Sequence, residues 1–324
     1  MESYIKDKVC MVTGGGGSIG GEIARTLSRM GAARIVAVDI SENGLYDLMT
    51  DVSGITGEIA SIRDEGKMEY LFDEYRPNIV FHAAAHKHVP FMEQNPEEAV
   101  KNNIRGTQIT ANLAEKYGAE RFVLISTDKA VEPVSVMGAT KRVCEMMIYE
   151  MSKTSHTVFS TVRFGNVLGS NGSVVPLFRK QAQKGVVTVT DARAERYFMT
   201  MERAANVVIS CAKHMKGGEV FVPDMGESIK IIDLAEKIIN ESGTDAEILV
   251  TSLRQGDKLT EKLFYDFETL EVCGIDGVKR TSGSSVEGLY EYIDRLQEKA
   301  DICDRRGIRA VLSEMTGVAD LLRG

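Results

Sequence analysis

The chain has 324 residues, of which 43% are hydrophobic and 27% charged, and its formal net charge is −8. This length suits a cofactor-binding domain with a substrate-binding addition, and the composition is that of an ordinary soluble enzyme. The acidic balance excludes wholesale nucleic-acid binding, and no signal peptide or apolar run of about eighteen residues is visible. We therefore expect a cytoplasmic protein with no nucleic-acid partner and no membrane contact.

Apolar strands alternate with amphipathic helices along the first half of the chain. The pattern predicts strands at 8–13, 34–39, 78–82 and 121–126, and helices at 18–30, 96–117 and 138–152. Continuous apolar strands separated by helices indicate a parallel sheet covered on both faces. The expected fold is therefore α/β, a Rossmann-like doubly wound parallel sheet.

Beyond about Gly165 the regular alternation of strands and helices gives way to loops that contain Gly and Pro, with helices expected near 201–215 and 228–242. We expect residues 1–165 to form the Rossmann domain, to which the helix near 201–215 returns. Residues 166–324 should form mainly a smaller, discontinuous substrate-binding region. The five cysteines are far apart, so we expect buried, reduced thiols, and the five histidines lack metal-ligand spacing, so we expect no metal.

A glycine-rich turn joins the first strand to the first helix. Its glycines follow the spacing Gly-x-x-Gly-x-x-Gly, which permits a tight turn and close approach of backbone amides to a pyrophosphate. Asp39 ends the second strand, where a carboxylate can bind both ribose hydroxyls and repel a 2′-phosphate. The turn therefore predicts a dinucleotide site that prefers NAD to NADP, with contacts from Gly14, Gly17, Ser18, Ile19, Gly20 and Asp39.

Three further segments resemble the extended short-chain dehydrogenase/reductase family, and this resemblance extends over nearly the whole chain. The resemblance implies an adenine contact from Arg63 and Asp64, after the third strand. It places three alanines beneath the cofactor and Asn103 in the family's Asn-x-x-Gly-Thr helix. The alanines are Ala83, Ala84 and Ala85, and close helix–strand packing is their alternative role.

The family's catalytic Tyr-x-x-x-Lys signature is altered here, because Met137 precedes Lys141 at the tyrosine's place. A thioether has no proton to exchange and is a weak hydrogen-bond acceptor. The run Ser126-Thr127-Asp128-Lys129 supplies two titratable groups just upstream, and it resembles the Ser-Thr-Asp-Glu run of nucleotide-sugar 4,6-dehydratases. The longer match, which includes Arg-Phe-Gly-Asn166, resembles the capsule and polysaccharide branch that acts on UDP-N-acetylglucosamine.

The resemblance implies a role for each catalytic candidate. Asp128 is the acid at the C6 oxygen, Lys129 the base at C5, and Thr127 the partner of the C4 oxygen. Lys141 binds the nicotinamide ribose, and Met137 packs against the sugar or belongs to the core. The acid–base assignment needs a protonated Asp128 and a neutral Lys129, the reverse of the ion pair expected in water.

The nucleotide half of the substrate needs cations and carboxylates of its own. Arg254 and Asp257 lie in a segment that resembles the Arg-x-Gly-Asp/Glu motif of nucleotide-sugar enzymes, where arginine holds the diphosphate and the carboxylate the ribose. Asn166 and Arg196 match other positions of that pocket, and a surface salt bridge is the alternative for Arg196. Lys87 and His88 follow the alanine strand end and are expected to face the sugar.

Members of the branch that carry methionine at the tyrosine position retain configuration at C5, whereas the inverting members keep the tyrosine. The expected activity is therefore a C5-retaining, NAD-dependent UDP-N-acetylglucosamine 4,6-dehydratase, acting as a homo-oligomer. A UDP-sugar 4-epimerase and a C5-inverting dehydratase are the alternatives among enzymes. A catalytically inactive NAD- and nucleotide-binding regulatory protein is the alternative of another class.

Overall fold

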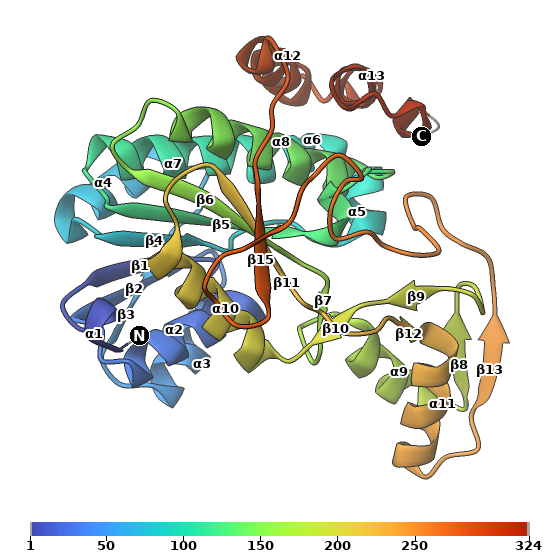
Figure 1. Cartoon of the computed structure of the whole chain (residues 1–324). Helices are drawn as coiled ribbons and strands as arrows, with labels where there is room; N and C mark the ends of the chain where they lie inside the picture. The colour runs from blue at the N-terminus through green and yellow to red at the C-terminus, as the bar shows by residue number, and fades with distance from the viewer. Residues whose placement is uncertain (1, 323–324) are drawn as a thin grey trace.

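The computed structural model describes residues 2–322, and a nine-stranded sheet forms its centre (Figure 1). Across the sheet the strands run in the order β14-β15-β11-β6-β5-β4-β1-β2-β3. Pairing is parallel from β3 to β11, whereas β15 is antiparallel to β11 and β14 is antiparallel to β15. In chain order the strands are β1 (Val9–Thr13), β2 (Arg34–Asp39), β3 (Ile55–Ile59), β4 (Ile79–His82), β5 (Arg121–Thr127), β6 (Val158–Phe164), β11 (Glu219–Pro223), β14 (Glu271–Val272) and β15 (Val278–Ser282).

Helices cover both faces of this sheet, and each face has its own hydrophobic core (Figure 1). One core packs α2, α3 and α10 against the strands, and the other packs α4, α7 and α8 against the opposite face. The α/β fold expected from the sequence is confirmed. The helices around the sheet are α1 (Glu2–Ile5), α2 (Ser18–Arg29), α3 (Glu42–Asp51), α4 (Glu65–Tyr75), α5 (Val89–Gln94), α6 (Pro96–Ala99), α7 (Gly106–Lys116), α8 (Val136–Ser152) and α10 (Met201–His214).

The segment expected to form a helix at 96–117 contains one π-helical turn, which is wider than an α-helical turn and which the sequence did not predict. Between α6 and α7 the backbone forms a π-helix, η1 (Val100–Arg105), and keeps right-handed helical torsions on both sides. Asn103 lies in this turn with its side chain buried. Its amide accepts a hydrogen bond from His86 N at 2.8 Å and donates to His86 O and to Thr140 Oγ1, each at 3.1 Å. The wide turn thus ties the segment after β4 to α8.

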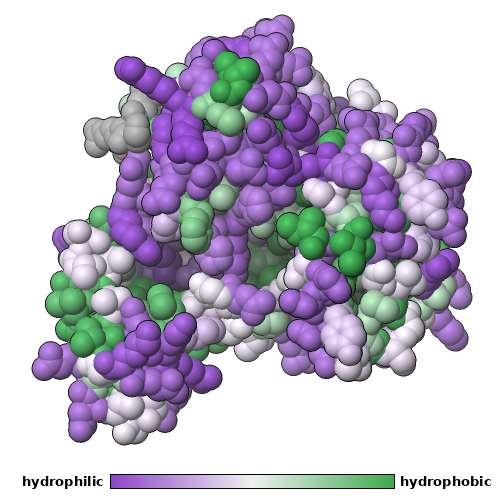
Figure 2. Space-filling view, turned by 180° about the vertical axis from the view of Figure 1, so that it is seen from behind, coloured by the Kyte–Doolittle hydropathy of each residue, from purple (hydrophilic) through white to green (hydrophobic). Residues whose placement is uncertain are grey.

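A smaller lobe lies beyond the carboxyl end of the sheet (Figure 1). A separate cluster of buried apolar side chains holds its helices against a two-stranded parallel sheet, β8–β13. In Figure 2 apolar atoms gather on this lobe, and five large apolar residues of its helices and strands are exposed, namely Leu177, Val186, Ile229, Leu249 and Val250. The elements of this region are β7 (Asn166–Val167), α9 (Val174–Ala182), β8 (Val186–Val189), β9 (Glu195–Arg196), β10 (Phe198–Met199), β12 (Ile229–Lys230), α11 (Ile231–Ser242) and β13 (Glu247–Val250).

Two C-terminal helices, α12 (Leu289–Asp301) and α13 (Arg305–Thr316), pack on the Rossmann helices rather than on the smaller lobe (Figure 1). The substrate-binding role expected for most of residues 166–324 remains a prediction. A buried ion pair joins Arg309 of α13 to Glu93 of α5 at 2.8 Å, and the other Glu93 oxygen accepts the amide of Val136 at the start of α8. The short helix η3 (Ala319–Leu322) follows.

Three of the cysteines, Cys10, Cys144 and Cys211, are buried and free, as expected. Cys273 is half-buried and Cys303 is exposed, so the expectation of buried thiols is wrong for Cys303. The reason is its place in the turn between α12 and α13, where the backbone has a positive φ of 56°. None of the helices within residues 2–322 combines the length and the apolarity that crossing a bilayer requires.

Candidate active site

A pocket of about 840 Å³ lies at the carboxyl ends of β1, β4, β5 and β6. Ligands of open α/β sheets bind at this edge, where neighbouring strands connect to helices on opposite faces. Many of the sequence-predicted residues line it together. They are Gly14, Gly17, Ser18, Ile19, Gly20, Ala83, Ala85, Lys87, His88, Thr127, Lys129, Met137, Lys141, Asn166, Arg254 and Asp257.

Several glycines of the turn leave no room for a side chain, and Gly14 and Gly20 illustrate this. A Cβ at Gly14, where φ is 73°, would lie 2.7 Å from the amide nitrogen of Ala84, and a Cβ at Gly20 would lie 2.1 Å from the carbonyl oxygen of Gly14. The turn therefore brings bare backbone to the start of α2, where unpaired amides and the helix dipole favour an anion. This cradle suits the pyrophosphate of a dinucleotide.

Asp39 lies at the end of β2 beside the same turn. Its two carboxylate oxygens accept hydrogen bonds from the amides of Gly16 at 3.0 Å and Ser41 at 2.9 Å. Each oxygen keeps a further lone pair for a ligand hydroxyl, because a carboxylate offers about four acceptor sites. The backbone thus holds the carboxylate in place without using up its capacity.

Four residues predicted to contact the cofactor have observed contacts elsewhere. Arg63 forms an ion pair with Glu98 at 2.7 Å, and Asp64 caps α4 by accepting the amide of Lys67. Asn103 bridges two segments as described above, and Ala84 packs its backbone against Gly14. Their cofactor roles remain predictions.

The acid–base pair lies where β5 passes into the 3₁₀ turn η2 (Asp128–Ala130). Asp128 is fully buried. Its Oδ1 accepts hydrogen bonds from Thr127 Oγ1 at 2.9 Å and Lys129 Nζ at 3.0 Å. Its Oδ2 is buried without a hydrogen-bond partner among the described residues. An unpaired buried oxygen is costly. Asp128 itself is not among the residues that line the pocket, whereas its neighbours Thr127 and Lys129 are.

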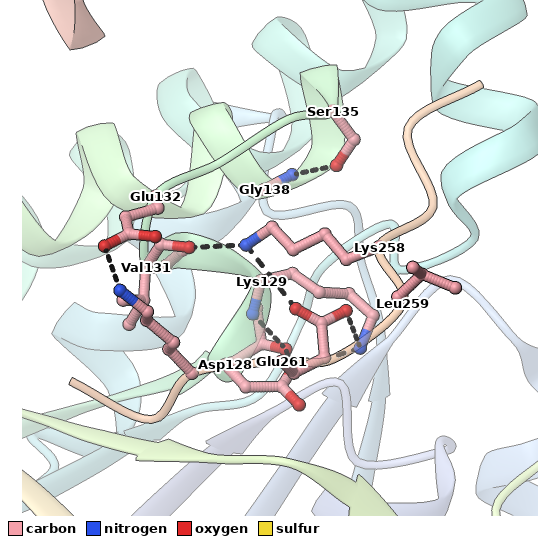
Figure 3. Close-up of polar contacts among 12 residues, drawn as sticks. Asp128, Lys129, Val131, Glu132, Ser135, Gly138, Lys258, Leu259 and Glu261 are labelled. Carbon is pink, nitrogen blue, oxygen red and sulfur yellow. Dashed lines mark hydrogen bonds and ion pairs between the residues drawn. The ribbon is translucent and has the colours of Figure 1, made fainter. Parts of the chain in front are cut away.

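Lys129 enters the pocket from the same turn and also donates to Asn166 Oδ1 at 3.3 Å. Burial acts to lower the pKa of Lys129, but the carboxylates of Asp128 and Glu261 outweigh burial and raise it. Asp128 and Lys129 form an ion pair at 3.0 Å (Figure 3). A base role for the lysine requires that it lose its proton before it acts.

The helix α8 brings Met137 and Lys141 to the pocket wall one turn apart. Ser135 caps this helix by accepting the amide of Gly138 at 3.1 Å. Only 3% of Met137 is exposed, so the methionine belongs to the core and to the pocket lining at once. Burial lowers the pKa of Lys141, whose ammonium donates no hydrogen bond to another described residue. It is free to bind a ligand in the pocket.

Of the residues predicted to bind the nucleotide sugar, all but Arg196 line the pocket. Lys87 reaches Ser170 Oγ at 3.4 Å, and Arg254 pairs with Asp257 at 3.1 Å on the pocket rim. Arg196 does not line the pocket, because its guanidinium donates to the carbonyl groups of Lys258 at 2.7 Å and Leu259 at 2.9 Å. In this structure Arg196 supports the segment that carries Arg254; its substrate contact remains a prediction.

Two buried acidic groups near the pocket were missed in the sequence. Glu261 lies 3.6 Å from Lys129, and Glu145 accepts a hydrogen bond from Ser126 at 2.6 Å and pairs with Arg163 at 2.7 Å. The available signal was the arginine inside the apolar strand Val158–Phe164, since a buried guanidinium requires carboxylate partners. Nothing local signals Glu261.

Residues 10–281 match the family model described as "Polysaccharide biosynthesis protein". The chain belongs to this family. The relationship confirms the polysaccharide-biosynthesis branch expected from the sequence motifs. Within residues 2–322 no three His, Cys, Asp or Glu side chains gather as a metal site requires.

Two curated proteins are similar in sequence to this chain. The "Probable polysaccharide biosynthesis protein EpsC" of Bacillus subtilis is 50% identical over 81% of this chain and 46% of its own length, so the chain spans about half of that relative. The "UDP-N-acetylglucosamine 4,6-dehydratase (inverting)" of Campylobacter jejuni is 31% identical over 90% of both chains. The X-ray structure of Pen from Bacillus thuringiensis superposes with a TM-score of 0.82 at 33% identity, covering 88% of this chain and 90% of the other.

Proposed function

We propose that this protein is an NAD-dependent UDP-N-acetylglucosamine 4,6-dehydratase that retains configuration at C5. The observation that carries the proposal is the Asp128–Lys129 pair, because its lysine lines the same pocket as Met137 and the glycine turn. A buried carboxylate and an amine at the same site supply an acid and a base, whereas the methionine supplies neither. The relative named a UDP-N-acetylglucosamine 4,6-dehydratase supports the substrate class.

The glycine turn, Asp39 and Lys141 would hold NAD against the floor of the pocket. When bound, NAD accepts a hydride from C4 of the sugar and returns it to C6. The close approach of Gly14 to Ala83 and Ala84 leaves no side chain over this cradle, and the Lys141 ammonium has no other hydrogen-bond partner among the described residues. Both features fit a bound dinucleotide.

The residues account for every proton of the reaction. Asp128, as a carboxylate, takes the proton of the 4-hydroxyl while the C4 hydride leaves, and the ketone that forms acidifies the C5 proton. Neutral Lys129 then removes the C5 proton, and protonated Asp128 passes its proton to the C6 hydroxyl, which leaves as water. After the hydride reaches C6, Lys129 returns its proton to C5. Because one amine removes and restores this proton from one face, configuration at C5 is retained.

The test is incubation of the protein with UDP-N-acetylglucosamine, with product mass and proton NMR as readouts. Loss of one water and a 4-keto-6-deoxy sugar with the original C5 configuration is expected. A C5-inverted sugar as the primary product would establish the runner-up, which the "inverting" name of the Campylobacter relative favours. A C4 isomer of unchanged mass would indicate an epimerase. An unchanged substrate would contradict the proposal and favour an inactive nucleotide-binding protein.

Asp39→Ala is expected to narrow the preference for NAD over NADP. The variant loses charge-assisted hydrogen bonds to the adenosine ribose, worth about 1.5–3 kcal/mol each, and also the repulsion of a 2′-phosphate. The ratio of the two dissociation constants should therefore fall at least ~tenfold, as measured by calorimetry. Asp51→Ala is the matched control, since Asp51 pairs with Arg25 on the surface. Equal affinity of the unmutated protein for both cofactors would refute the assignment.

A further inference from the structure

A buried carboxylate from a distant part of the chain faces the proposed base. Glu261 lies in the irregular segment 251–270 between β13 and β14, which we call the 251–270 loop. Its side chain is only 2% exposed. Three cations surround it, two of which, Lys129 and Lys258, are labelled in Figure 3. The carboxylate lies 3.6 Å from Lys129 Nζ, 3.5 Å from Lys258 Nζ and 3.9 Å from Arg196 Nε. Burial of a carboxylate is tolerated here because cations compensate its charge.

The three cations donate their hydrogen bonds to other groups. Lys258 donates to Val131 O at 2.7 Å, Arg196 donates to backbone carbonyls, and Lys129 donates to Asp128 and Asn166. Glu261 Oε2 has no hydrogen-bond partner among the described residues. Glu261 therefore acts on its neighbours through its charge and not through a directed hydrogen bond, and its effect on Lys129 is electrostatic.

The 251–270 loop is fixed to the catalytic turn at several points, which keeps Glu261 in place. Lys258 and Tyr265 donate to the carbonyl groups of Val131 and Ala130, the latter at 2.9 Å. Farther along the loop, Glu268 pairs with buried Arg163 at 2.9 Å. The same loop carries Arg254 and Asp257 to the pocket rim. The segment that offers groups to the nucleotide thus also delivers a charge to the catalytic lysine.

The charged groups around Lys129 come from three elements. Asp128 belongs to its own turn η2, Arg196 to β9, and Glu261 and Lys258 to the 251–270 loop. Two carboxylates thus flank the ammonium, at 3.0 and 3.6 Å. We propose that Glu261 is a positioning residue that holds charged Lys129 between two carboxylates and sets the pH at which the lysine becomes a base. The catalytic half of this proposal rests on the dehydratase function proposed above, whereas the electrostatic half does not.

The first measurement follows the charge of Lys129 directly and needs no substrate. In protein labelled with ¹³C-lysine, the Lys129 Cε signal is assigned by its loss in Lys129→Met and followed through a pH titration. Glu261→Gln removes a negative charge at 3.6 Å, so the Lys129 titration should move to lower pH by about one unit or more. Glu261→Asp keeps the charge, so in this variant the Lys129 titration should lie between those of the unmutated protein and Glu261→Gln. Glu261→Asp also replaces Glu261→Gln if that variant fails to fold.

The matched control is Glu132→Gln, because Glu132 pairs with exposed Lys262 beside the same cluster and is not paired with Lys129. This control should leave the Lys129 titration where it is. Identical titrations of the unmutated protein and both Glu261 variants would overturn the proposal, whatever the protein's activity.

The second measurement is the pH profile of kcat for dehydration of UDP-N-acetylglucosamine. The rising limb of this pH profile should move to lower pH in Glu261→Gln, because Lys129 loses its proton at lower pH when the negative charge beside it is removed. A merely structural role would lower kcat at every pH and leave the shape of the profile unchanged, which would contradict the catalytic half. A shifted Lys129 titration in a protein that does not turn over this sugar would uphold the electrostatic role and refute the proposed function instead.

Discussion

Lys129→Met and Asp128→Asn should each lower dehydration of UDP-N-acetylglucosamine by about 10²–10⁴-fold, the usual contribution of a positioned acid or base. Methionine cannot take the C5 proton, and the asparagine amide cannot pass a proton to the C6 oxygen. UDP binding, measured by calorimetry, should be largely intact, because the groups proposed for the nucleotide, Arg254 and Asp257, lie on another segment. Product formation by mass spectrometry gives the rate.

Lys262→Met is the control for the lysine variant. Lys262 is an exposed lysine of the same neighbourhood, paired with Glu132, and its loss should change the rate little. In Lys129→Met the cofactor absorbance should still report transient reduction, since hydride leaves C4 before C5 is deprotonated. A rate within a factor of three of the unmutated enzyme in either catalytic variant would eliminate the assigned role.

Arg163→Met is expected to have the largest effect on stability, about 3–5 kcal/mol in the free energy of unfolding. Arg163 is fully buried in β6 and pairs with Glu145 at 2.7 Å and Glu268 at 2.9 Å, both of which are also buried. The variant leaves Glu268 without a cation and Glu145 with only Arg142, at 3.3 Å. Urea unfolding followed by circular dichroism measures the difference.

The control is Arg193→Met, because Arg193 is exposed and pairs with Asp191 on the surface. Exposed pairs contribute about 0–1 kcal/mol, so this variant should unfold nearly as the unmutated protein does. Adding Glu268→Gln to Arg163→Met should restore part of the lost stability, since it removes one of the uncompensated charges. A loss below about 1 kcal/mol in Arg163→Met would show that the buried carboxylates are neutral or solvated.

These two effects connect the fold to the chemistry. Glu145 lies four residues after Lys141 on α8, and it also accepts a hydrogen bond from Ser126 on the pocket wall. Arg163 of β6 therefore holds Glu145 in place, and Glu145 joins the helix that carries Met137 and Lys141 to Ser126, on the strand that leads into Thr127. Its loss should disturb the catalytic turn as well as the core.

The sequence by itself determined the helices and strands of the Rossmann domain and the residues that follow its strands at the pocket. Apolar runs, helical periodicity and a glycine turn are local patterns, and most of the predicted bounds lie within two residues of those observed. Parallel strands bring their carboxyl ends to one edge, so residues that follow β1, β4 and β5 meet there without further information. Met137 and Lys141 share the pocket because four residues make about one helical turn.

Only the tertiary structure decided which distant charges meet. Glu261 reaches Lys129 across 132 positions of the chain, and Glu268 reaches Arg163 across 105. Arg196, which was predicted to belong to the nucleotide-sugar pocket, supports the 251–270 loop in this structure, and α13 packs on α5 and α8. No local pattern encodes such pairs, because each depends on how loops and helices pack and on the need of every buried charge for a compensating partner.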